Sequence, residues 1–193
     1  MHSLVTQLSR FRSAEDRVVE ETDPAVLLGG VVDLLKPEAL GRQIQLQIDA
    51  ESGLPMIAVV ANEIRQVLLN LILNAIQAVE EKGVIRVGVR RADEGEGILL
   101  WVSDTGPGIS PDNLEKVFDP LYTSKSNGSG LGLAVARDLV HGHGGTINVD
   151  STPGEGATFV VLLPKGGEPK EAIAGKGDRS RLDSRGLDLR GRV

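Results

Sequence analysis

The sequence predicts an α/β fold, a two-layer sandwich in which three helices cover one face of a mixed, mostly antiparallel sheet. Helix-like and strand-like apolar patterns follow one another along residues 23–164, which is typical of this class. Only 3% of the residues are aromatic, so the core must be aliphatic. Glycine makes up 24 of 193 residues, about twice its usual share, which indicates turns and backbone that approaches another group closely.

Composition and charge exclude several classes of protein. With 40% apolar residues the chain can bury a core, and its net charge of −6 argues against a protein that coats nucleic acid or an anionic membrane. The absence of cysteine excludes disulfides and thiolate zinc sites. No apolar run approaches the roughly 18 residues of a membrane span, and no signal-peptide core is seen. We therefore expect a soluble, cytoplasmic chain with no nucleic-acid partner and no direct membrane contact.

Charge and pattern divide the chain into three segments. Residues 1–22 are expected to be the end of an amphipathic helix with one apolar stripe, formed by Leu4, Leu8 and Phe11. Residues 23–164 carry the regular pattern. Residues 165–193 hold eight basic and five acidic residues, net +3, which leaves net −9 for the rest of the chain. Because this last segment has no regular apolar period, we expect a solvated, disordered tail, with a basic patch as the alternative.

The first half of the regular segment alternates between helices and short strands. Asp23 and Pro24 predict a helix that stops before Gly41, because Asp caps a helix and Pro suits its first position. Strict alternation predicts a strand over 43–49, and 56–60 is a short strand candidate. Residues 62–81 form the strongest predicted helix, since their apolar residues follow the 3, 4, 3, 4 spacing.

The second half is richer in strands. Two strands are predicted at 84–91 and 97–103, joined by a turn, and a loop-rich stretch follows over 104–130. A helix is expected from about 131 to 141. The last two strands, joined by a Pro-Gly turn, are predicted at 145–150 and 156–164.

Four amides lie along one side of the strongest predicted helix. At about 100° per residue, Gln66, Asn70, Asn74 and Gln77 fall within an arc of about 80°. Their simplest role is hydrogen bonding to water or to a neighbouring loop, because an unpaired buried amide is unfavourable. The functional alternative is that Asn70 and Asn74 offer oxygen atoms to a hard cation such as Mg²⁺.

Two glycine-rich segments, with a lysine between them, suit a nucleotide. The Asp104 carboxylate of DTGPGI, at the end of a strand, can accept a hydrogen bond from an exocyclic amine such as that of adenine, although a plain turn has the same composition. The glycines of 127–133 expose N–H groups at a helix start, which suits phosphates, but a lone loop of this kind is weak evidence. Neither the dinucleotide-binding nor the Walker pattern is met. Lys125 is positioned for a terminal phosphate or is a plain surface lysine.

The order of these motifs resembles the ATP-binding catalytic domain of sensor histidine kinases, in the GHKL superfamily with type II topoisomerase and heat-shock chaperone ATPases. Over about residues 24–164, segment 65–78 looks like the N box, DTGPGI like the G1 box, Phe118 like the F box and GSGLGL like the G2 box. The Tyr-Thr-Ser-Lys sequence at 122–125 is similar to the nitrogen-regulatory class of these kinases. The family fold, a Bergerat-type two-layer α/β sandwich, agrees with the elements predicted above.

The resemblance implies a nucleotide-binding role for each matching residue. Asp104 would accept the adenine amino group, helped by Thr158 on the adjacent strand. Gly106 and Gly108 would let the base lie close to the backbone, and Asn74 would hold Mg²⁺. The residues implied to bind ATP are Asn70, Asn74, Asp104, Gly106, Gly108, Ile109, Thr123, Ser124, Lys125, Gly128, Ser129, Gly130, Leu131, Gly132, Leu133 and Thr158.

Asn70 and Lys125 are the two residues implied to act in catalysis. Lys125 would reach the γ-phosphate from a mobile lid over residues 109–130. Water-hydrolysing relatives carry a glutamate one turn before the Mg²⁺ asparagine, whereas Asn70 cannot act as a general base at neutral pH. We therefore expect phosphoryl transfer to a histidine rather than hydrolysis.

None of the three histidines is expected to be the phosphate acceptor. His2 has no acidic residue after it, and of His141 and His143 the latter is expected to be structural. The implied partners are ATP, a histidine-bearing dimerisation domain outside this chain, and through that histidine the receiver domain of a response regulator. Residues 1–22 would be the remnant of a dimerisation helix. The alternatives are a nucleotide-binding regulatory module without transfer activity and a water-hydrolysing ATPase.

Overall fold

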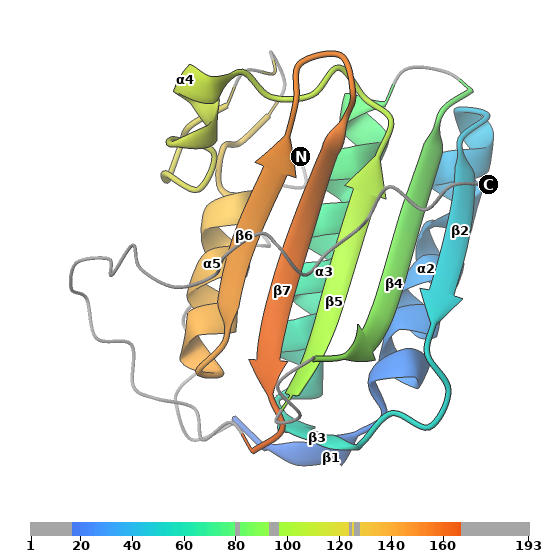
Figure 1. The fold of residues 1–193 in the computed structure, drawn as a ribbon, viewed down its shortest axis with the longest axis vertical. Coiled ribbons are helices and arrows are strands. Elements are labelled where there is room, and N and C mark those ends of the chain that lie inside the picture. The colour runs from blue at the N-terminus through green and yellow to red at the C-terminus, as the bar shows by residue number, and fades with distance from the viewer. Residues whose placement is uncertain (1–16, 80–81, 93–96, 124, 126–127, 167–193) are drawn as a thin grey trace.

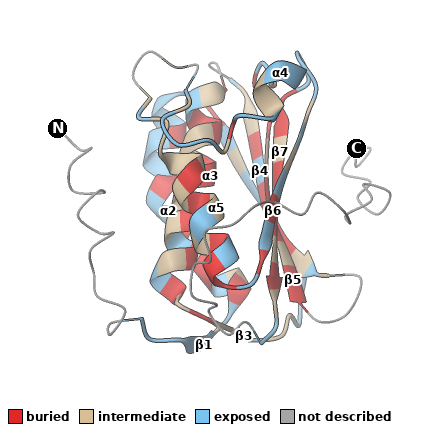
Figure 2. Cartoon of the chain, turned by 90° about the vertical axis from the view of Figure 1, so that its left-hand side faces the viewer, coloured by how far each residue is buried: buried red, intermediate tan, exposed pale blue. Residues whose placement is uncertain are grey.

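The chain forms two layers, a sheet and a set of helices packed on one of its faces (Figure 1; Figure 2). The computed structural model describes residues 17–79, 82–92, 97–123, 125 and 128–166. Across the sheet the strands follow the order β2 (Gln45–Ala50), β4 (Val84–Arg91), β5 (Gly97–Asp104), β7 (Ala157–Pro164) and β6 (Thr146–Ser151). The helices of the second layer are α2 (Pro24–Gly41), α3 (Ala61–Ala78) and α5 (Gly132–Gly142). The predicted α/β sandwich is confirmed.

The sheet is mixed and mostly antiparallel, as predicted. Strand β2 runs parallel to β4, whereas the other three pairings are antiparallel. Alternate residues of the central strands, such as Val87, Val102 and Phe159, face the helices and are at most 1% exposed. They pack with the apolar stripe of α3 into a core that is aliphatic apart from Phe159, which agrees with the aromatic-poor composition.

Strand β1 (Glu20–Thr22) corrects the prediction for the start of the chain. It pairs antiparallel with β3 (Ile57–Val59) in a separate two-stranded sheet, so the predicted helix is wrong for Glu20–Thr22. The physical reason is Pro24, which keeps Asp23 extended at φ −75° and ψ 115° and therefore ends any preceding helix. Residues 17–19 are not helical either, and residues 1–16 of the predicted helix lie outside the described part of the chain.

Asp23 caps α2, as the sequence predicts. Its Oδ1 accepts hydrogen bonds from the N–H groups of Ala25 (2.8 Å) and Val26 (3.2 Å), and Pro24 occupies the first helical turn. The helix includes Gly41 instead of stopping before it.

Two boundaries near the site differ from the predictions. Helix α3 ends at Ala78 rather than 81, because Val79 is extended and its side chain lies where a Cβ on Gly83 would be. The loop-rich stretch contains the short helix α4 (Pro111–Leu114), which was not predicted although Pro111 at its first position is a helix-start signal. Of the predicted disordered tail, residues 165–193, the part from 167 to 193 lies outside the described part of the chain. Of the helices that are described, none combines the length and hydropathy needed to cross a membrane.

Candidate nucleotide site

Most of the predicted site residues come together at one end of the sandwich. Asp104 is the last residue of β5, three of the four amides (Asn70, Asn74 and Gln77) lie on the second half of α3, and α5 begins at Gly132 close to Asn70 (Figure 1). Asp104 faces the helix layer because it shares the face of the buried residues Leu100 and Val102, four and two positions earlier in the strand.

The Asp104 carboxyl group is a buried hydrogen-bond acceptor. The residue is 6% exposed, and its Oδ1 accepts from the N–H of Gly106 at 2.8 Å. Burial raises the pKa of Asp104 above its ordinary value, while the N–H groups of Gly106 and Ala157 and the charge of Lys125 oppose the rise. A desolvated acceptor of this kind gains from a ligand that donates a hydrogen bond, and an exocyclic amine is such a donor.

The turn after Asp104 needs its glycines. A Cβ on Gly106 would lie 2.8 Å from Asp104 Oδ1 and 3.1 Å from the Ala78 carbonyl oxygen. Gly108 has a φ of +72°, and a Cβ there would overlap the Thr152 carbonyl. Both glycines are therefore needed because other parts of the protein itself pack closely against their backbone.

Ser151 fastens this turn and was missed by the sequence analysis. Its hydroxyl accepts from the N–H of Ile109 (2.8 Å) and donates to the carbonyl of Gly156 (2.6 Å). The Gly154 N–H also donates to the Pro107 carbonyl at 2.7 Å. A serine at the end of a strand carries no signal of this role, because its partners are distant in sequence.

Thr158 does not join Asp104. On β7 the partner of Asp104 is Ala157, whereas Thr158 pairs with Ser103 and donates to its hydroxyl at 2.9 Å. Successive strand residues point to opposite faces, so the Thr158 hydroxyl lies on the face away from the helices. The expectation that Thr158 assists Asp104 is therefore wrong by one position, because the strand pairing could not be read from the sequence.

Asn70 connects α3 to the start of α5. Its Nδ2 donates to the Gly132 carbonyl and its Oδ1 accepts from Gln66 Nε2, each at 2.9 Å. This agrees with the simpler expectation for the amides, hydrogen bonding to a neighbouring segment. Asn70 thus holds in position the helix start at which the glycine-rich motif ends.

Asn74 faces a cation. Lys125 Nζ donates to Asn74 Oδ1 at 2.8 Å and to the Asn74 carbonyl at 3.2 Å, with Gln77 Oε1 at 3.4 Å. Burial lowers the pKa of Lys125 below its ordinary value. The negative charge of Asp104 opposes this shift, whereas the positive charge of Arg42 lowers the pKa further. Because amide oxygens that surround an ammonium group also suit a hard cation, this donor set fits Mg²⁺. Within the described residues, no cluster of three His, Asp or Glu side chains offers another metal site.

Phe118 anchors the loop between the two glycine motifs, as predicted. Its ring meets Phe159 edge to face at 6.2 Å between centroids. The Arg137 guanidinium, which the sequence analysis did not nominate, lies over the same ring at 5.9 Å. The loop is therefore fixed to the core at this point.

The glycine motif has its own backbone constraints. Gly130 has a φ of +66° and accepts from the Leu121 N–H at 2.9 Å, and Thr123 Oγ1 accepts from the Lys125 N–H at 3.0 Å. A Cβ on Gly128 would overlap Thr123 Oγ1. Ser124 lies outside the described part of the chain.

Helix α5 starts without a side-chain cap. Its N-cap residue is Leu131, whose N–H donates weakly to Ser129 Oγ at 3.4 Å. Ile109 and Leu133, on either side of residues 110–132, both pack against the core. The first N–H groups of the helix are therefore the kind of donors that phosphate oxygens accept.

His143 is structural, as predicted. It is 1% exposed, its Nε2 accepts from the Val60 N–H (3.1 Å) and its Nδ1 donates to the Leu139 carbonyl (2.8 Å). Both ring nitrogens are used within the fold, which leaves neither for phosphate transfer.

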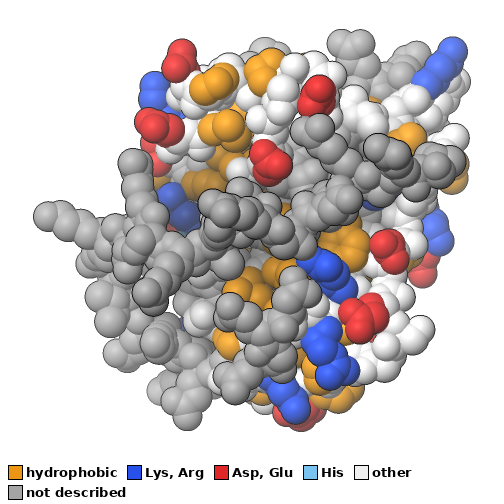
Figure 3. Space-filling model, in the orientation of Figure 1, with side chains coloured by type: hydrophobic (Ala, Val, Ile, Leu, Met, Phe, Trp, Pro, Cys, Tyr) orange, Lys and Arg blue, Asp and Glu red, His pale blue; other side chains and the backbone are white. Residues whose placement is uncertain are grey.

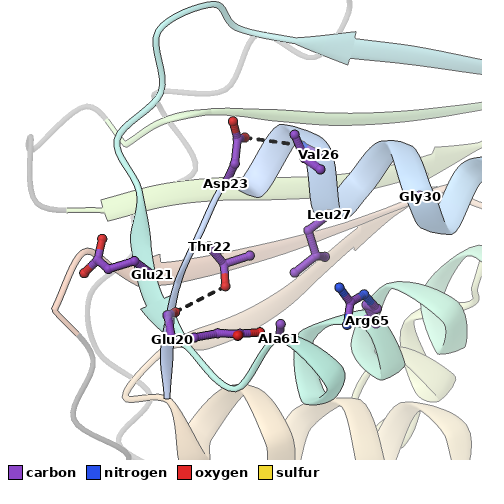
Figure 4. Close-up of a pocket in the computed structure, with 9 residues that line it drawn as sticks. All are labelled: Glu20, Glu21, Thr22, Asp23, Val26, Leu27, Gly30, Ala61 and Arg65. Carbon is purple, nitrogen blue, oxygen red and sulfur yellow. Dashed lines mark hydrogen bonds between the residues drawn. The ribbon is translucent and has the colours of Figure 1, made fainter. Parts of the chain in front are cut away.

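A groove lies at the opposite end of the sandwich from Asp104 (Figure 4). It is formed by β1 and by the first turns of α2 and α3, with Val26 and Arg65 on its walls. None of the predicted site residues lines it. The predicted site residues therefore lie at the Asp104 end of the sandwich and not in this groove.

Comparison with known proteins agrees with this geometry. The family model for the histidine kinase-, DNA gyrase B- and HSP90-like ATPases matches residues 59–167. Sensor histidine kinase ZraS of Escherichia coli (strain K12) is 39% identical over 164 residues, which are 85% of this chain and 35% of that protein. The chain thus spans about a third of the length of this relative.

Solved structures of histidine kinases share the fold. The catalytic domain of histidine kinase ThkA has a TM-score of 0.71 at 28% identity, covering 79% of this chain and 99% of that one. Full-length ShkA in complex with AMPPNP has a TM-score of 0.73 at 30% identity, covering 86% of this chain and 35% of that one. ThkA in complex with the response regulator TrrA has a TM-score of 0.70 at 25% identity, covering 86% and 47%.

The fold is that of the ATPase-type catalytic domains of histidine kinases. The chain belongs to the histidine kinase-, DNA gyrase B- and HSP90-like ATPase family. Its similar proteins are sensor histidine kinases, in which such a domain is the catalytic part.

Proposed function

We propose that this domain binds Mg-ATP and transfers the γ-phosphate to a histidine on a dimerisation domain outside the chain. The observation that carries the proposal is that a buried acceptor, Asp104, lies at the same end of the sandwich as the Lys125 ammonium group, which the Asn74 oxygens hold. The amine of a nucleotide base needs a hydrogen-bond acceptor and its phosphate chain needs a cation, so a nucleotide site needs both groups close together. The ATP-analogue complex of the relative ShkA supports the same substrate class.

Each residue has a defined task in this proposal. Asp104 accepts a hydrogen bond from the adenine amine, and the Gly106–Gly108 turn keeps side chains away from the base. The uncapped start of α5 donates N–H groups to phosphate oxygens. Bound Mg²⁺, held by Asn74, supplies charge neutralisation on the phosphates. Lys125, after leaving Asn74, stabilises the charge on the γ-phosphate.

Transfer to a histidine is favoured over hydrolysis by the bonds of Asn70. An amide cannot take a proton from water at neutral pH, and both ends of this amide are already engaged by Gln66 and Gly132. Asn70 therefore acts here as a positioning residue for α5. A nucleotide-binding regulatory module without transfer activity is the second candidate, since none of the three histidines is expected to be the acceptor.

The partners follow from the reaction. The phosphorylated histidine would pass its phosphate to a receiver domain, as the complex of the relative ThkA with a response regulator suggests for that kinase. ATP is a cytoplasmic substrate, so we propose a cytoplasmic location. The Tyr-Thr-Ser-Lys sequence at 122–125 supports assignment to the nitrogen-regulatory class.

The first test is calorimetric titration of the full chain with a non-hydrolysable ATP analogue, with and without Mg²⁺. We expect binding in the micromolar range, weakened at least tenfold in Asp104→Asn and unchanged in Asp112→Asn, an exposed carboxylate on α4. Equal affinity in the Asp104 variant would remove adenine recognition by this residue and with it the basis of the proposal.

The second test separates transfer from mere binding. The chain is mixed with the histidine-bearing dimerisation domain of a close relative and with labelled ATP. Acid-labile phosphate on that domain is the expected result. Binding of ATP without any phosphohistidine on every dimerisation domain tried would favour the regulatory module.

A further inference from the structure

The two central strands are apolar on both faces. Strand β5 contains the run ILLWV at 98–102 and β7 the run FVVLL at 159–163. A sheet covered on one face only shows alternation of apolar and polar residues, whereas continuous runs are typical of strands covered on both. The helices account for one face of these runs, and the other face needs a cover as well.

The outward-facing residues form one apolar block. Trp101 pairs with Val160 and Leu99 with Leu162 across the β5–β7 ladder, so the four side chains are neighbours on the face opposite the helices. The Trp101 ring lies against Gly88, where a Cβ would overlap it. Hydrophobic side chains are visible near the middle of this face, with charged side chains around them (Figure 3).

The same face holds a charge without an acceptor. Arg90 on β4 pairs with Leu99, and its Nε and Nη2 are buried with no hydrogen-bond partner in the described part of the chain. Trp101 is only 8% exposed, although no described helix or strand lies over it. A buried guanidinium calls for carboxylate or carbonyl oxygens, and a buried indole calls for an apolar cover.

We propose that the C-terminal segment, residues 167–193, lies across this outer face and covers Trp101 and Arg90. The segment follows directly on β7, whose outward residues form half of the apolar block, and Gly166 is the last described residue before it. At about 3.3 Å per residue it can run the length of an eight-residue strand several times.

The composition of the segment matches the surface that it would cover. Its last part, LDSRGLDL at 182–189, brings leucines and aspartates together. The leucines suit the Trp101 block, and the carboxylates of Asp183 and Asp188 suit the Arg90 guanidinium. This docking is independent of the proposed kinase activity, because it involves the face of the sheet away from Asp104.

Trp101 is the only tryptophan of the chain, so its fluorescence reports on the cover directly. The full chain is compared with Leu182→Ser/Leu187→Ser/Leu189→Ser and with a matched control, Lys170→Ser/Lys176→Ser/Arg179→Ser. We expect a red-shifted emission and an acrylamide quenching constant raised severalfold in the leucine variant only. Far-UV circular dichroism checks that both variants keep the fold.

A chain ending at Gly166 provides the second arm. It should show the same exposure of Trp101, and a synthetic peptide of residues 167–193 should reverse the change when added. Unchanged emission and quenching in both the leucine variant and the shortened chain would overturn the proposal. If Trp101 of the full chain becomes exposed on dilution, and sedimentation shows a matching fall in mass, the proposal is overturned in favour of a second copy on this face.

Discussion

The Lys125 ammonium lies 2.8 Å from the Asn74 side-chain oxygen, at the atom for which a magnesium ion would compete. The same ammonium contacts the Asn74 carbonyl and Gln77, and it acts on the charge of Asp104. Lys125 thus occupies the position on α3 that we propose for the metal ion. Under the proposed function, nucleotide binding would exchange one cation for another, so that Lys125 would first compete with Mg²⁺ and then bind the nucleotide.

Lys125→Met should separate ATP from ADP. We expect about a tenfold loss of affinity for the ATP analogue, or about 1.4 kcal/mol, because the γ-phosphate loses its cation. Affinity for Mg-ADP should stay equal or improve, because Asn74 no longer has to release an ammonium group. Calorimetry with both nucleotides measures the two effects, with the exposed Lys116→Met as control. An equal loss for ADP and ATP would contradict a γ-phosphate role.

Asn70→Ala should loosen the start of α5. Losing the bond to the Gly132 carbonyl and the partner of Gln66 should lower the free energy of unfolding by about 1–2 kcal/mol. Asn70→Asp should lower it further, because a carboxylate would face the Gly132 carbonyl with no proton to donate. Urea denaturation measures these changes, with the exposed Asn62→Ala as control. Loss of nucleotide affinity with unchanged stability would instead make Asn70 a direct ligand.

Gly108 and Gly154 form a matched pair for the turn beside Asp104. Both have positive φ, +72° and +85°, but an added Cβ meets the Thr152 carbonyl at the first and nothing within 4 Å at the second. Gly154→Ala should therefore lower stability by about 1 kcal/mol, from backbone strain alone. Gly108→Ala should lower it by ~1–3 kcal/mol more and weaken nucleotide binding. Thermal denaturation measures the loss of stability in each variant. Equal losses would show that the turn accommodates the added methyl group at Gly108.

The sequence was sufficient to predict the structure wherever a local pattern of residues determines it. The periodicity of α3, the Asp23 cap and the apolar strands follow from neighbouring residues, and all are found. Phe118 was also predictable, because an aromatic residue in a polar loop of an aromatic-poor chain needs an apolar site. It packs on Phe159.

The sequence was insufficient where strand pairing decides which side chains meet. The pairing of Asp104 with Ala157 sets the Thr158 hydroxyl on the far face, and no local pattern encodes that pairing. Ser151 and Arg137 were missed for the same reason, since their partners Ile109 and Phe118 are distant in sequence. The hydrogen bond between Asn70 and Gly132 likewise depends on how α5 docks on α3.

Asp104 should weaken the nucleotide-free fold at neutral pH. Burial raises its pKa in the folded state above the ordinary value of 3.8, so the folded chain binds this proton more tightly than the unfolded chain. Its contribution to stability is therefore fully present below 3.8 and is lost as pH rises through the folded-state pKa. Asp104→Asn keeps an oxygen acceptor for the Gly106 N–H, and because an amide does not titrate, its stability has no such loss as pH rises.

The free energy of unfolding of Asp104→Asn, minus that of the original chain, should therefore grow as pH rises from about 3.5 to 7. At neutral pH we expect the variant to be at least as stable, although it binds the ATP analogue poorly, which is the trade-off typical of a functional group held in an unfavourable environment. Urea denaturation across this range gives the difference, and Asp112→Asn should show no comparable growth. A difference that shrinks with rising pH would mean that the Gly106 and Ala157 N–H groups and Lys125 outweigh burial, and that Asp104 stabilises the fold as an anion.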